Sequence, residues 1–352
     1  MISPYSLTLP GGVQTQILGL AASLRRAGVD VRVLGPCDGP PPAVGITPLG
    51  NSVPTAANGS IAPLAPDVPA QLRTMRALWE ENFDVLHLHE PIAPGPTMTA
   101  TLIKPCPIVG TFHAAGSSAA YRYINRGCRY LLSRIDLKCA VSQAAEDMAH
   151  EMIGGTYERV FNGVDIDYYG TAKPHPTLGP TIFFVGRHEK RKGLEVLLDA
   201  MSQLPPAVRL WVGGDGPETA RLQRSTAGAD PRIEWLGRLD ETEKASRLRG
   251  ADIFCAPSLH GESFGVVLLE AMAAETAIVA SALDGYSRVA EQGIHAELVP
   301  PGDASALAAA LGTVLFDAGR ASHLVRAGIE RVEQFSMDRL ARRYIDMYER
   351  LG

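Results

Sequence analysis

The sequence has no excess of basic residues, no long hydrophobic run and few cysteines, and each absence excludes a class of protein. With 33 lysines and arginines against 38 acidic residues, the net charge of −5 provides no basic field that would attract nucleic acid. The five cysteines are scattered without zinc-site or CxxC spacing, which favours a reducing compartment. No stretch resembles a signal peptide or is apolar enough to cross a bilayer. We therefore expect a cytoplasmic protein without nucleic-acid partners, whose contact with a membrane would be peripheral.

The sequence also lacks the glycine pattern of a Rossmann-type oxidoreductase or epimerase. Such enzymes carry a G-x-G-x-x-G turn followed by an acidic residue about 20 positions later. The segment GGDG at residues 213–216 has no third glycine at that spacing. A dinucleotide-dependent enzyme is therefore disfavoured.

What the sequence does contain is a repeated alternation of strands and helices. Helical periodicity predicts helices at residues 13–27, 68–80 and 340–351. Short β-rich runs predict strands at residues 29–34, 85–89, 108–113, 140–142, 160–165, 181–185, 209–212, 233–236, 253–256, 277–280 and 296–299. This alternation is typical of α/β proteins with doubly wound parallel sheets, and 352 residues suffice for two such domains.

Composition sets the expected domain boundaries. Residues 168–180 are rich in proline and glycine and predict a linker, so we expect domains at 1–168 and 169–336. Residues 337–352 would form a C-terminal helix that returns to the first domain. Loops at the carboxyl ends of the strands would line a cleft between the two domains.

The N-terminal segment departs from this pattern. The PGG turn at residues 10–12 opens a helix, and such a turn normally follows a buried strand, yet few residues precede it. We expect a first strand that is truncated. An alternative is that the chain is a truncated, non-catalytic relic that still binds a nucleotide sugar.

Two glutamates eight residues apart, Glu262 and Glu270, are the most informative feature of the sequence. They flank a turn at residues 263–265 and an apolar run that predicts the start of a helix, so they would lie about two turns apart on nearly the same face. Carboxylates placed this way are suited to the two ends of one extended polar ligand rather than to a shared metal ion. Backbone N–H groups at the same helix start would suit a phosphate or a sugar edge. The alternative is ordinary complementation of the helix dipole.

A cationic segment, GRHEKRKG at residues 186–193, follows a predicted strand. Arg187 and Lys192 offer a planar fork and a point charge to a diphosphate, whereas Lys190 and Arg191 receive no role. Gly11 and Gly12 would let backbone N–H groups approach a diphosphate closely. A solvated run of charges and a purely structural turn are the respective alternatives.

Six motifs, taken together and in order, resemble glycosyltransferase family 4, a retaining family with the GT-B fold. They are PGGV at 10–13, HLHEP at 87–91, TFH at 111–113, NGVD at 162–165, the cationic segment at 186–193 and the glutamate pair at 262–270. Within that family the sequence is similar to the actinobacterial phosphatidylinositol mannosyltransferases. The resemblance covers the whole chain except the first strand.

The resemblance implies roles for individual residues. Catalysis would involve Arg187 and Lys192 as the diphosphate clamp, Glu262 at the sugar hydroxyls and His113 near the donor sugar, although a lone histidine in an apolar strand is often a core residue. Glu270 would bind the ribose hydroxyls. The full implied donor set is Gly11, Gly12, Leu239, Glu241, Lys244, Ser263, Phe264, Gly265 and Glu270. The implied acceptor set is Tyr5, Gln14, Asn58 and Ser60.

The implied reaction moves a hexose from a nucleotide diphospho-sugar without a cofactor or a metal ion. The acidic segment at 237–244 would accept from guanine N1 and N2, which favours GDP-mannose, with a UDP-sugar as the alternative. No residue is placed as a nucleophile, so front-face attack is expected: the leaving diphosphate takes the acceptor proton and the clamp stabilises its charge.

The acceptor side departs from the mannosyltransferase pattern. Where those enzymes carry an arginine after the serine that corresponds to Ser60, this chain has IAPL at 61–64, and the loop after His113 is AAGSS in place of a threonine- and lysine-bearing segment. We therefore expect phosphatidylinositol to be a poor substrate, and the acceptor stays open between an inositol phospholipid and another lipid or small polyol. Arg122, Arg126 and Arg129 have helical spacing and would face an anionic membrane at the inner face of the plasma membrane, or else only solvent.

Overall fold

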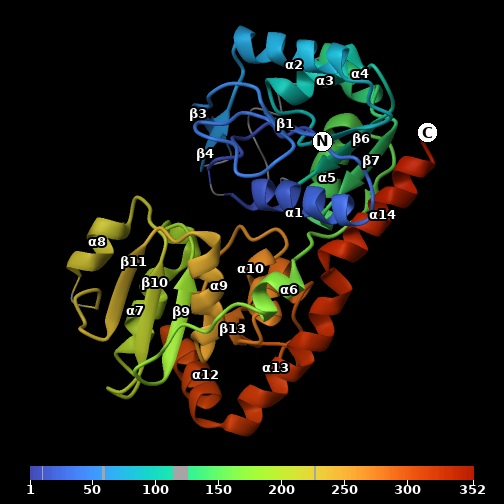
Figure 1. Ribbon diagram of the computed structural model, residues 1–352. Helices are drawn as coiled ribbons and strands as arrows, with labels where there is room; N and C mark the ends of the chain where they lie inside the picture. The colour runs from blue at the N-terminus through green and yellow to red at the C-terminus, as the bar shows by residue number, and fades with distance from the viewer. Residues whose placement is uncertain (10, 58–59, 114–125, 226) are drawn as a thin grey trace. The chain divides into compact units, whose positions relative to one another are not determined.

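The computed structural model describes residues 1–9, 11–57, 60–113, 126–225 and 227–352 (Figure 1). The chain forms two compact units, one made of residues 1–163 with 337–352 and the other of residues 164–336. We call them unit 1 and unit 2. The C-terminal segment thus belongs to the same unit as the N-terminal half, and both units are α/β structures with parallel sheets, as the sequence predicted.

The two units divide between residues 163 and 164, five residues before the predicted boundary at 168, and part of the segment predicted as a linker at 168–180 packs within unit 2. Helix α6 (Ile166–Gly170) lies against α9 (Glu241–Gly250) and α10 (Val266–Ala273), and its Tyr169 is 4% exposed. Further along, the N–H of His175 donates to the carbonyl of Ser246 at 2.9 Å. Proline and glycine mark the absence of regular structure there, not the absence of packing.

The sheet of unit 1 is parallel. Strands β5 (Leu86–His89), β6 (Ile108–Phe112), β7 (Leu137–Ala140) and β8 (Glu158–Arg159) are neighbours in that order, and β1 (Val33–Gly35) pairs with β2 (Ile46–Pro48). Ile2 connects the two groups because it forms parallel bridges with both Leu34 and Leu88. Ile2 therefore fills the strand position between β1 and β5.

The strand predicted at residues 160–165 is not formed. The backbone of Gly163 is instead bonded in both directions to the side-chain amide of Gln16, each bond 2.8 Å long. Val160 and Asn162 are buried. The apolar character that predicted a strand therefore reflects burial. The N–H of Val160 donates to the carbonyl of Ala140, and Val164 forms only an isolated bridge with Ser336.

Helices α1 (Gly12–Arg26) and α14 (Met337–Glu349) lie side by side in unit 1 (Figure 1). Both have an apolar face that is buried in the same core, through Ile17 and Leu20 on one helix and Leu340 and Tyr344 on the other. The remaining elements of this unit are α2 (Val68–Glu80), α3 (Pro96–Ile103), α4 (Arg126–Ser133), α5 (Gln143–Ile153) and the antiparallel hairpin of β3 (Val53–Ala57) and β4 (Ser60–Leu64).

Unit 2 contains a six-stranded parallel sheet in the order β11-β10-β9-β12-β13-β14. The strands are β9 (Thr181–Val185), β10 (Arg209–Gly213), β11 (Ile233–Gly237), β12 (Ile253–Ala256), β13 (Ala277–Ser281) and β14 (Glu297–Val299). In addition to α6, α9 and α10, its helices are α7 (Leu194–Met201), α8 (Thr219–Arg224), α11 (Asp284–Ser287), α12 (Ala304–Phe316) and α13 (Ala318–Val332), with short 3-10 turns η2 (Lys190–Lys192) and η3 (Glu333–Phe335).

The strand order of unit 2 locates its functional edge. The chain builds outward from β9 to β11, then returns to the other side of β9 and builds outward again from β12 to β14. The order therefore reverses between β9 and β12, and ligands of open α/β sheets bind outside the carboxyl ends of the strands at such a switch point. In the part of the chain that the structure describes, no helix has the length and apolar character needed to span a membrane.

Candidate functional site

The loops that follow β9 and β12 are pressed together at the switch point of unit 2. Gly193 has φ +65°, and a Cβ atom on it would lie 1.9 Å from the carbonyl oxygen of Pro257. The N–H of Leu259 donates to the carbonyl of Arg191 at 2.7 Å. Only glycine permits this contact, because a side chain would collide with backbone that cannot move aside. The contact brings the cationic segment beside the first glutamate of the pair.

Five charged side chains form an alternating series at this contact, which we call the ion-pair chain. Lys192 Nζ lies 2.6 Å from Glu262 Oε1, and Arg191 Nη1 lies 3.6 Å from the same oxygen. Arg191 Nε lies 2.8 Å from Glu189 Oε2, and Arg187 Nε lies 3.0 Å from Glu189 Oε1. Three cations are thus held by two carboxylates, which leaves the group with one net positive charge.

The two carboxylates of the ion-pair chain are less exposed than its guanidinium groups. The Glu189 and Glu262 side chains are 14% and 11% exposed, whereas Arg187 is 43% exposed. The structure therefore brings together Arg187, Lys192 and Glu262, which the sequence singled out. Arg191, to which the sequence assigned no role, contacts both carboxylates.

Glu262 is further fixed by two residues that the sequence did not reveal. Ser258 Oγ donates to Glu262 Oε1 at 2.9 Å and lies 3.1 Å from the hydroxyl of Tyr286. Burial raises the pKa of Tyr286 above its usual value, so the hydroxyl stays protonated. A Cβ atom on Gly285 would lie 2.1 Å from the carbonyl oxygen of Glu262, so backbone also closes on this residue. The position of Ser258, just past β12, is the signal that could have identified it.

Glu270 belongs to a separate cluster. Lys244 Nζ lies 2.9 Å from Glu270 Oε1 and 2.8 Å from Glu241 Oε2. Burial alone would lower the pKa of Lys244, but Glu270 and Glu241 raise it above its usual value. The ring centroid of Tyr169 lies 5.6 Å from Lys244 Nζ, and the hydroxyl of Tyr169 donates a hydrogen bond to Glu241 Oε2 at 3.3 Å. Each glutamate of the pair therefore has its own lysine.

The remaining donor-side residues surround these clusters. Phe264 is buried and Ser263 is partly exposed, and Gly265 forms the N-cap of α10 without a side-chain hydrogen bond. Leu239 lies over Gly213, whose Cβ position would be 2.8 Å from Leu239 Cδ1.

Of the unit 1 residues assigned to a diphosphate or an acceptor, Gly11, Gly12 and Gln14 lie at the start of α1. Gly11 is its N-cap, and a Cβ atom on Gly12 would meet nothing within 4 Å. The side chain of Gln14 is turned inward and donates to the carbonyl of Ser6 at 3.3 Å, while Tyr5 is half-buried. Asn58 lies outside the described residues, and Ser60 begins β4 with no side chain described.

His113 lies just past the carboxyl end of β6 within a buried polar network. Its Nε2 is 2.9 Å from Nδ1 of His89, and its backbone N–H donates to Glu90 Oε1 at 2.6 Å. Burial lowers the pKa of His113 to about 4, while Asn162 acts in the opposite direction. The imidazole is therefore neutral at pH 7 and can offer a hydrogen bond, but it is not a charged acid.

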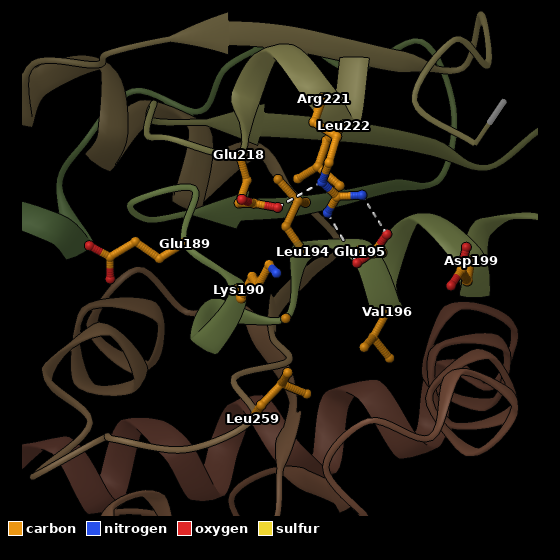
Figure 2. Close-up of a pocket in the computed structure, with 11 residues that line it drawn as sticks. Glu189, Lys190, Leu194, Glu195, Val196, Asp199, Glu218, Arg221, Leu222 and Leu259 are labelled. Atoms are coloured by element: carbon orange, nitrogen blue, oxygen red, sulfur yellow. Dashed lines mark hydrogen bonds and ion pairs between the residues drawn. The ribbon is translucent and has the colours of Figure 1, made fainter. Parts of the chain in front are cut away.

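A separate cavity of about 340 Å³ adjoins the ion-pair chain through Glu189 and is lined by Lys190 (Figure 2). Figure 2 shows Arg221 above it, bonded to Glu195 at 2.8 Å and to Glu218 at 2.7 Å. That guanidinium is already neutralised by two carboxylates. This cavity is therefore less suited to a diphosphate than the ion-pair chain is. Among the described residues, no group of three histidine, cysteine or acidic side chains could hold a metal ion.

The sequence assigned three arginines to a membrane surface. Arg122 lies outside the described residues, Arg126 has no described side chain, and Arg129 is exposed on α4.

Helix α2 shows a feature that sequence reasoning missed, an apolar stripe directed to solvent. Its members Val68, Leu72 and Trp79 are 65%, 59% and 69% exposed. Together with Met75, these residues follow the helical period, and this spacing is the signal that could have revealed the stripe.

Two family models match the chain. The model described as Glycosyltransferase Family 4 matches residues 10–168, and the model described as Glycosyl transferases group 1 matches residues 179–317. The chain is 39% identical to a phosphatidyl-myo-inositol mannosyltransferase of Mycobacterium leprae, over 99% of this chain and 96% of that protein. It is 36% identical to a protein of the same name from Propionibacterium freudenreichii, over 81% of this chain and 77% of that protein.

Solved structures support the fold. A structure of Anabaena HepE in complex with UDP and glucose matches with a TM-score of 0.76 and 20% identity, over 99% of this chain and 98% of that one. A sucrose-phosphate synthase from Thermosynechococcus elongatus also matches with a TM-score of 0.76 and 20% identity, over 99% and 98%. The predicted GT-B fold is thereby confirmed.

Proposed function

Because the chain belongs to glycosyltransferase family 4, we propose that it is a retaining transferase that moves mannose from GDP-mannose to a hydroxyl group of an inositol phospholipid. The ion-pair chain is the observation that carries this proposal. It places Arg187, Arg191 and Lys192 within one cluster at the switch point, where a diphosphate would bind.

In the proposed reaction, the bond between the anomeric carbon and the diphosphate oxygen breaks. The acceptor hydroxyl forms a new bond to the same face of that carbon, and its proton passes to the leaving diphosphate. Negative charge grows on the leaving oxygen in the transition state, and Arg187 and Lys192 stabilise it. These cations supply the charge that a metal ion supplies in other transferases, so we expect activity to survive chelation with EDTA.

The two glutamates would divide the donor between them. Glu262 would accept hydrogen bonds from sugar hydroxyls, and Glu270 from ribose hydroxyls. Their separate lysine partners support this division, because each carboxylate is held in a different cluster.

Mannose as the sugar is supported by the names of the relatives, whose identity to this chain extends over nearly its whole length. GDP as the nucleotide is supported by Glu241, whose carboxylate lies at the start of α9 and could accept from guanine. The alternative is a UDP-sugar. HepE, which shares the fold, binds UDP and glucose, but at 20% identity that likeness reports the fold alone.

The inositol phospholipid acceptor is supported by the same relatives, and the proposed site of action is the cytoplasmic face of the plasma membrane. The exposed stripe of α2 would enter the headgroup region, with Arg73 and Arg76 on the same helix close to anionic lipid. The absent arginine after Ser60 and the absent lysine after His113 predict weak binding of the lipid phosphate. A non-phosphatidylinositol acceptor is therefore the second candidate.

A panel of donors tests the proposal. Purified protein is incubated with GDP-mannose, UDP-glucose and UDP-N-acetylglucosamine, with phosphatidylinositol in vesicles and with soluble polyols, and products are identified by mass spectrometry. Transfer from GDP-mannose with an α-linked product supports the proposal. A β-linked product would overturn retention. Absence of transfer and hydrolysis with every donor would support the non-catalytic alternative.

A further inference from the structure

The carboxylates of the ion-pair chain occupy the cations that a diphosphate needs. We propose that Glu189 and Glu262 are internal competitors for the donor diphosphate, and that Glu262 thereby makes the site prefer the intact nucleotide sugar over the nucleoside diphosphate left after transfer. This inference rests on the proposed function, since it concerns the same site.

The charge of the ion-pair chain requires an exchange. Its three cations and two carboxylates carry one net positive charge, whereas a nucleoside diphosphate carries two to three negative charges. If both carboxylates kept their partners, the diphosphate would meet a site that does not neutralise it. Release of Lys192 from Glu262, and of the two arginines from Glu189, leaves the net charge unchanged but lets the three cations pair directly with phosphate oxygens.

Release has a cost for Glu262, because its side chain is only 11% exposed. Without Lys192 at 2.6 Å, its carboxylate keeps the hydrogen bond from Ser258 and a distant guanidinium at 3.6 Å. A poorly paired carboxylate with little access to water is unfavourable. Sugar hydroxyls in the proposed position would replace the lost donor. A nucleoside diphosphate has no sugar at this position, so Glu262 forms its ion pair with Lys192 again. The affinity of the site for the product is thereby lowered.

Glu189 differs from Glu262 in one respect that makes the inference testable. It holds the two arginines that stand two positions before and two positions after it, at 3.0 and 2.8 Å. No sugar-binding role is proposed for it. Glu189 therefore competes equally against the nucleotide sugar and the nucleoside diphosphate, whereas Glu262 competes mainly against the latter.

The test is a calorimetric titration of GDP and of GDP-mannose, without acceptor, into the wild type and three isosteric variants. Glu189→Gln is expected to tighten binding of both ligands about fivefold, because a neutral amide competes less for the arginines. Glu262→Gln is expected to tighten GDP but not GDP-mannose, so that the preference for GDP-mannose falls about tenfold. The matched control is Glu195→Gln, which removes an ion pair with Arg221 in the same unit and should change neither affinity.

Thermal unfolding of each variant reports whether the fold is retained. If Glu262→Gln is unfolded, Glu262→Asp, whose shorter side chain reaches Lys192 less well, tests the preference between the two ligands in its place. Glu189→Gln tests the competition itself, with the sensitivity of GDP binding to salt as a second readout, since more cations available to phosphate give a steeper dependence.

Two results would overturn the inference. A wild type that transfers mannose, combined with a Glu189→Gln variant that binds both ligands more weakly, would show that the carboxylates only brace the loop, and the proposed function would stand. A wild type that binds neither GDP nor GDP-mannose would overturn the proposed function and the inference with it.

Discussion

Nδ1 of His87 lies 2.7 Å from the hydroxyl of Tyr348, although 261 positions separate the two residues in sequence. The contact joins β5 to α14 within unit 1. The other ring nitrogen of His87 lies 2.8 Å from Thr111 Oγ1, which is itself 2.8 Å from the hydroxyl of Tyr344 on the same helix. The C-terminal helix is therefore fastened to the strands that carry His89 and His113 by a buried polar network as well as by its apolar face.

We expect Tyr348→Phe to destabilise unit 1 by about 1 to 3 kcal/mol, because it leaves a buried nitrogen of His87 without its partner. Unfolding in urea, followed by circular dichroism, measures the change. Tyr130→Phe is the control, since Tyr130 is 69% exposed on α4. Equal stability of the two variants would contradict a role for the network.

The buried histidines predict that unit 1 loses stability in acid. Burial lowers the pKa of His113 from 6.5 to about 4, so the unfolded chain binds a proton in this interval and the folded chain does not. The free energy of unfolding should therefore fall as pH drops from 6.5 to 4, by about 3 kcal/mol for His113. Burial also lowers the pKa values of His87 and His89, in the same direction.

Urea unfolding at pH 7.5, 6, 5 and 4 measures this slope. His113→Gln should flatten it, whereas His150→Gln, which removes an exposed histidine, should not. A wild-type free energy of unfolding that does not change between pH 6.5 and 4 would show that the histidines are charged in the folded state.

Lys192→Ala should lower kcat about 100- to 1,000-fold and change the Michaelis constant for GDP-mannose much less. The negative charge that Lys192 is proposed to stabilise grows on the leaving oxygen in the transition state, so the contact of the lysine with the diphosphate strengthens there. Steady-state kinetics with a matched Lys190→Ala control, from the same η2 turn, measure the difference. Equal losses in affinity and rate would assign Lys192 a ground-state role.

Glu270→Gln should have the opposite effect, a rise of about tenfold in the Michaelis constant for the donor with little change in kcat. Ribose contacts are the same before and during reaction, and hydrogen bonds to a charged group contribute about 1.5 to 3 kcal/mol. Glu275→Gln is the control, because Glu275 follows the same helix and is bonded to Arg249 instead. An unchanged Michaelis constant in Glu270→Gln would remove the ribose assignment.

Replacement of the α2 stripe should separate membrane binding from catalysis. We expect the double variant Leu72→Glu with Trp79→Glu to bind anionic vesicles at least about tenfold more weakly, because two exposed apolar side chains no longer enter the bilayer. Vesicle sedimentation measures binding, and Leu178→Glu, which changes an 85% exposed residue of unit 2, is the control. Transfer to a soluble acceptor should be unchanged.

Phosphatidylinositol in the same vesicles should be accepted only with a high Michaelis constant. A lipid phosphate without a paired cation binds less favourably by several kcal/mol than a clamped one. A low Michaelis constant for phosphatidylinositol would show that other residues replace the missing arginine and lysine.

The sequence by itself determined the strands of unit 2 and the family of the chain. Strands β9 and β12 have the predicted bounds because a parallel strand covered on both faces is a continuous apolar run ended by turn residues. Glu262 and Glu270, and Arg187 and Lys192, could be found because their spacing is local and follows predicted strands. The conformation of residues 160–165 and 168–180 could not be predicted, because their partners are distant in sequence. Gly163 is bonded to the side chain of Gln16, and Tyr169 is bonded to Glu241.

Only the tertiary structure determined which charged side chains form ion pairs with one another. The spacing of Glu262 and Glu270 suggested one shared ligand, but the loop after β9 brings Lys192 and Arg191 to Glu262, while α9 brings Lys244 to Glu270. These pairs join residues 26 to 71 positions apart, and strand order alone sets which loops are neighbours. From the sequence, Glu189 and Arg191 could not be distinguished from a solvated run of charges, because a local sequence shows charge but not which loops touch. The contact of the two loops depends on Gly193, which packs against the carbonyl of Pro257.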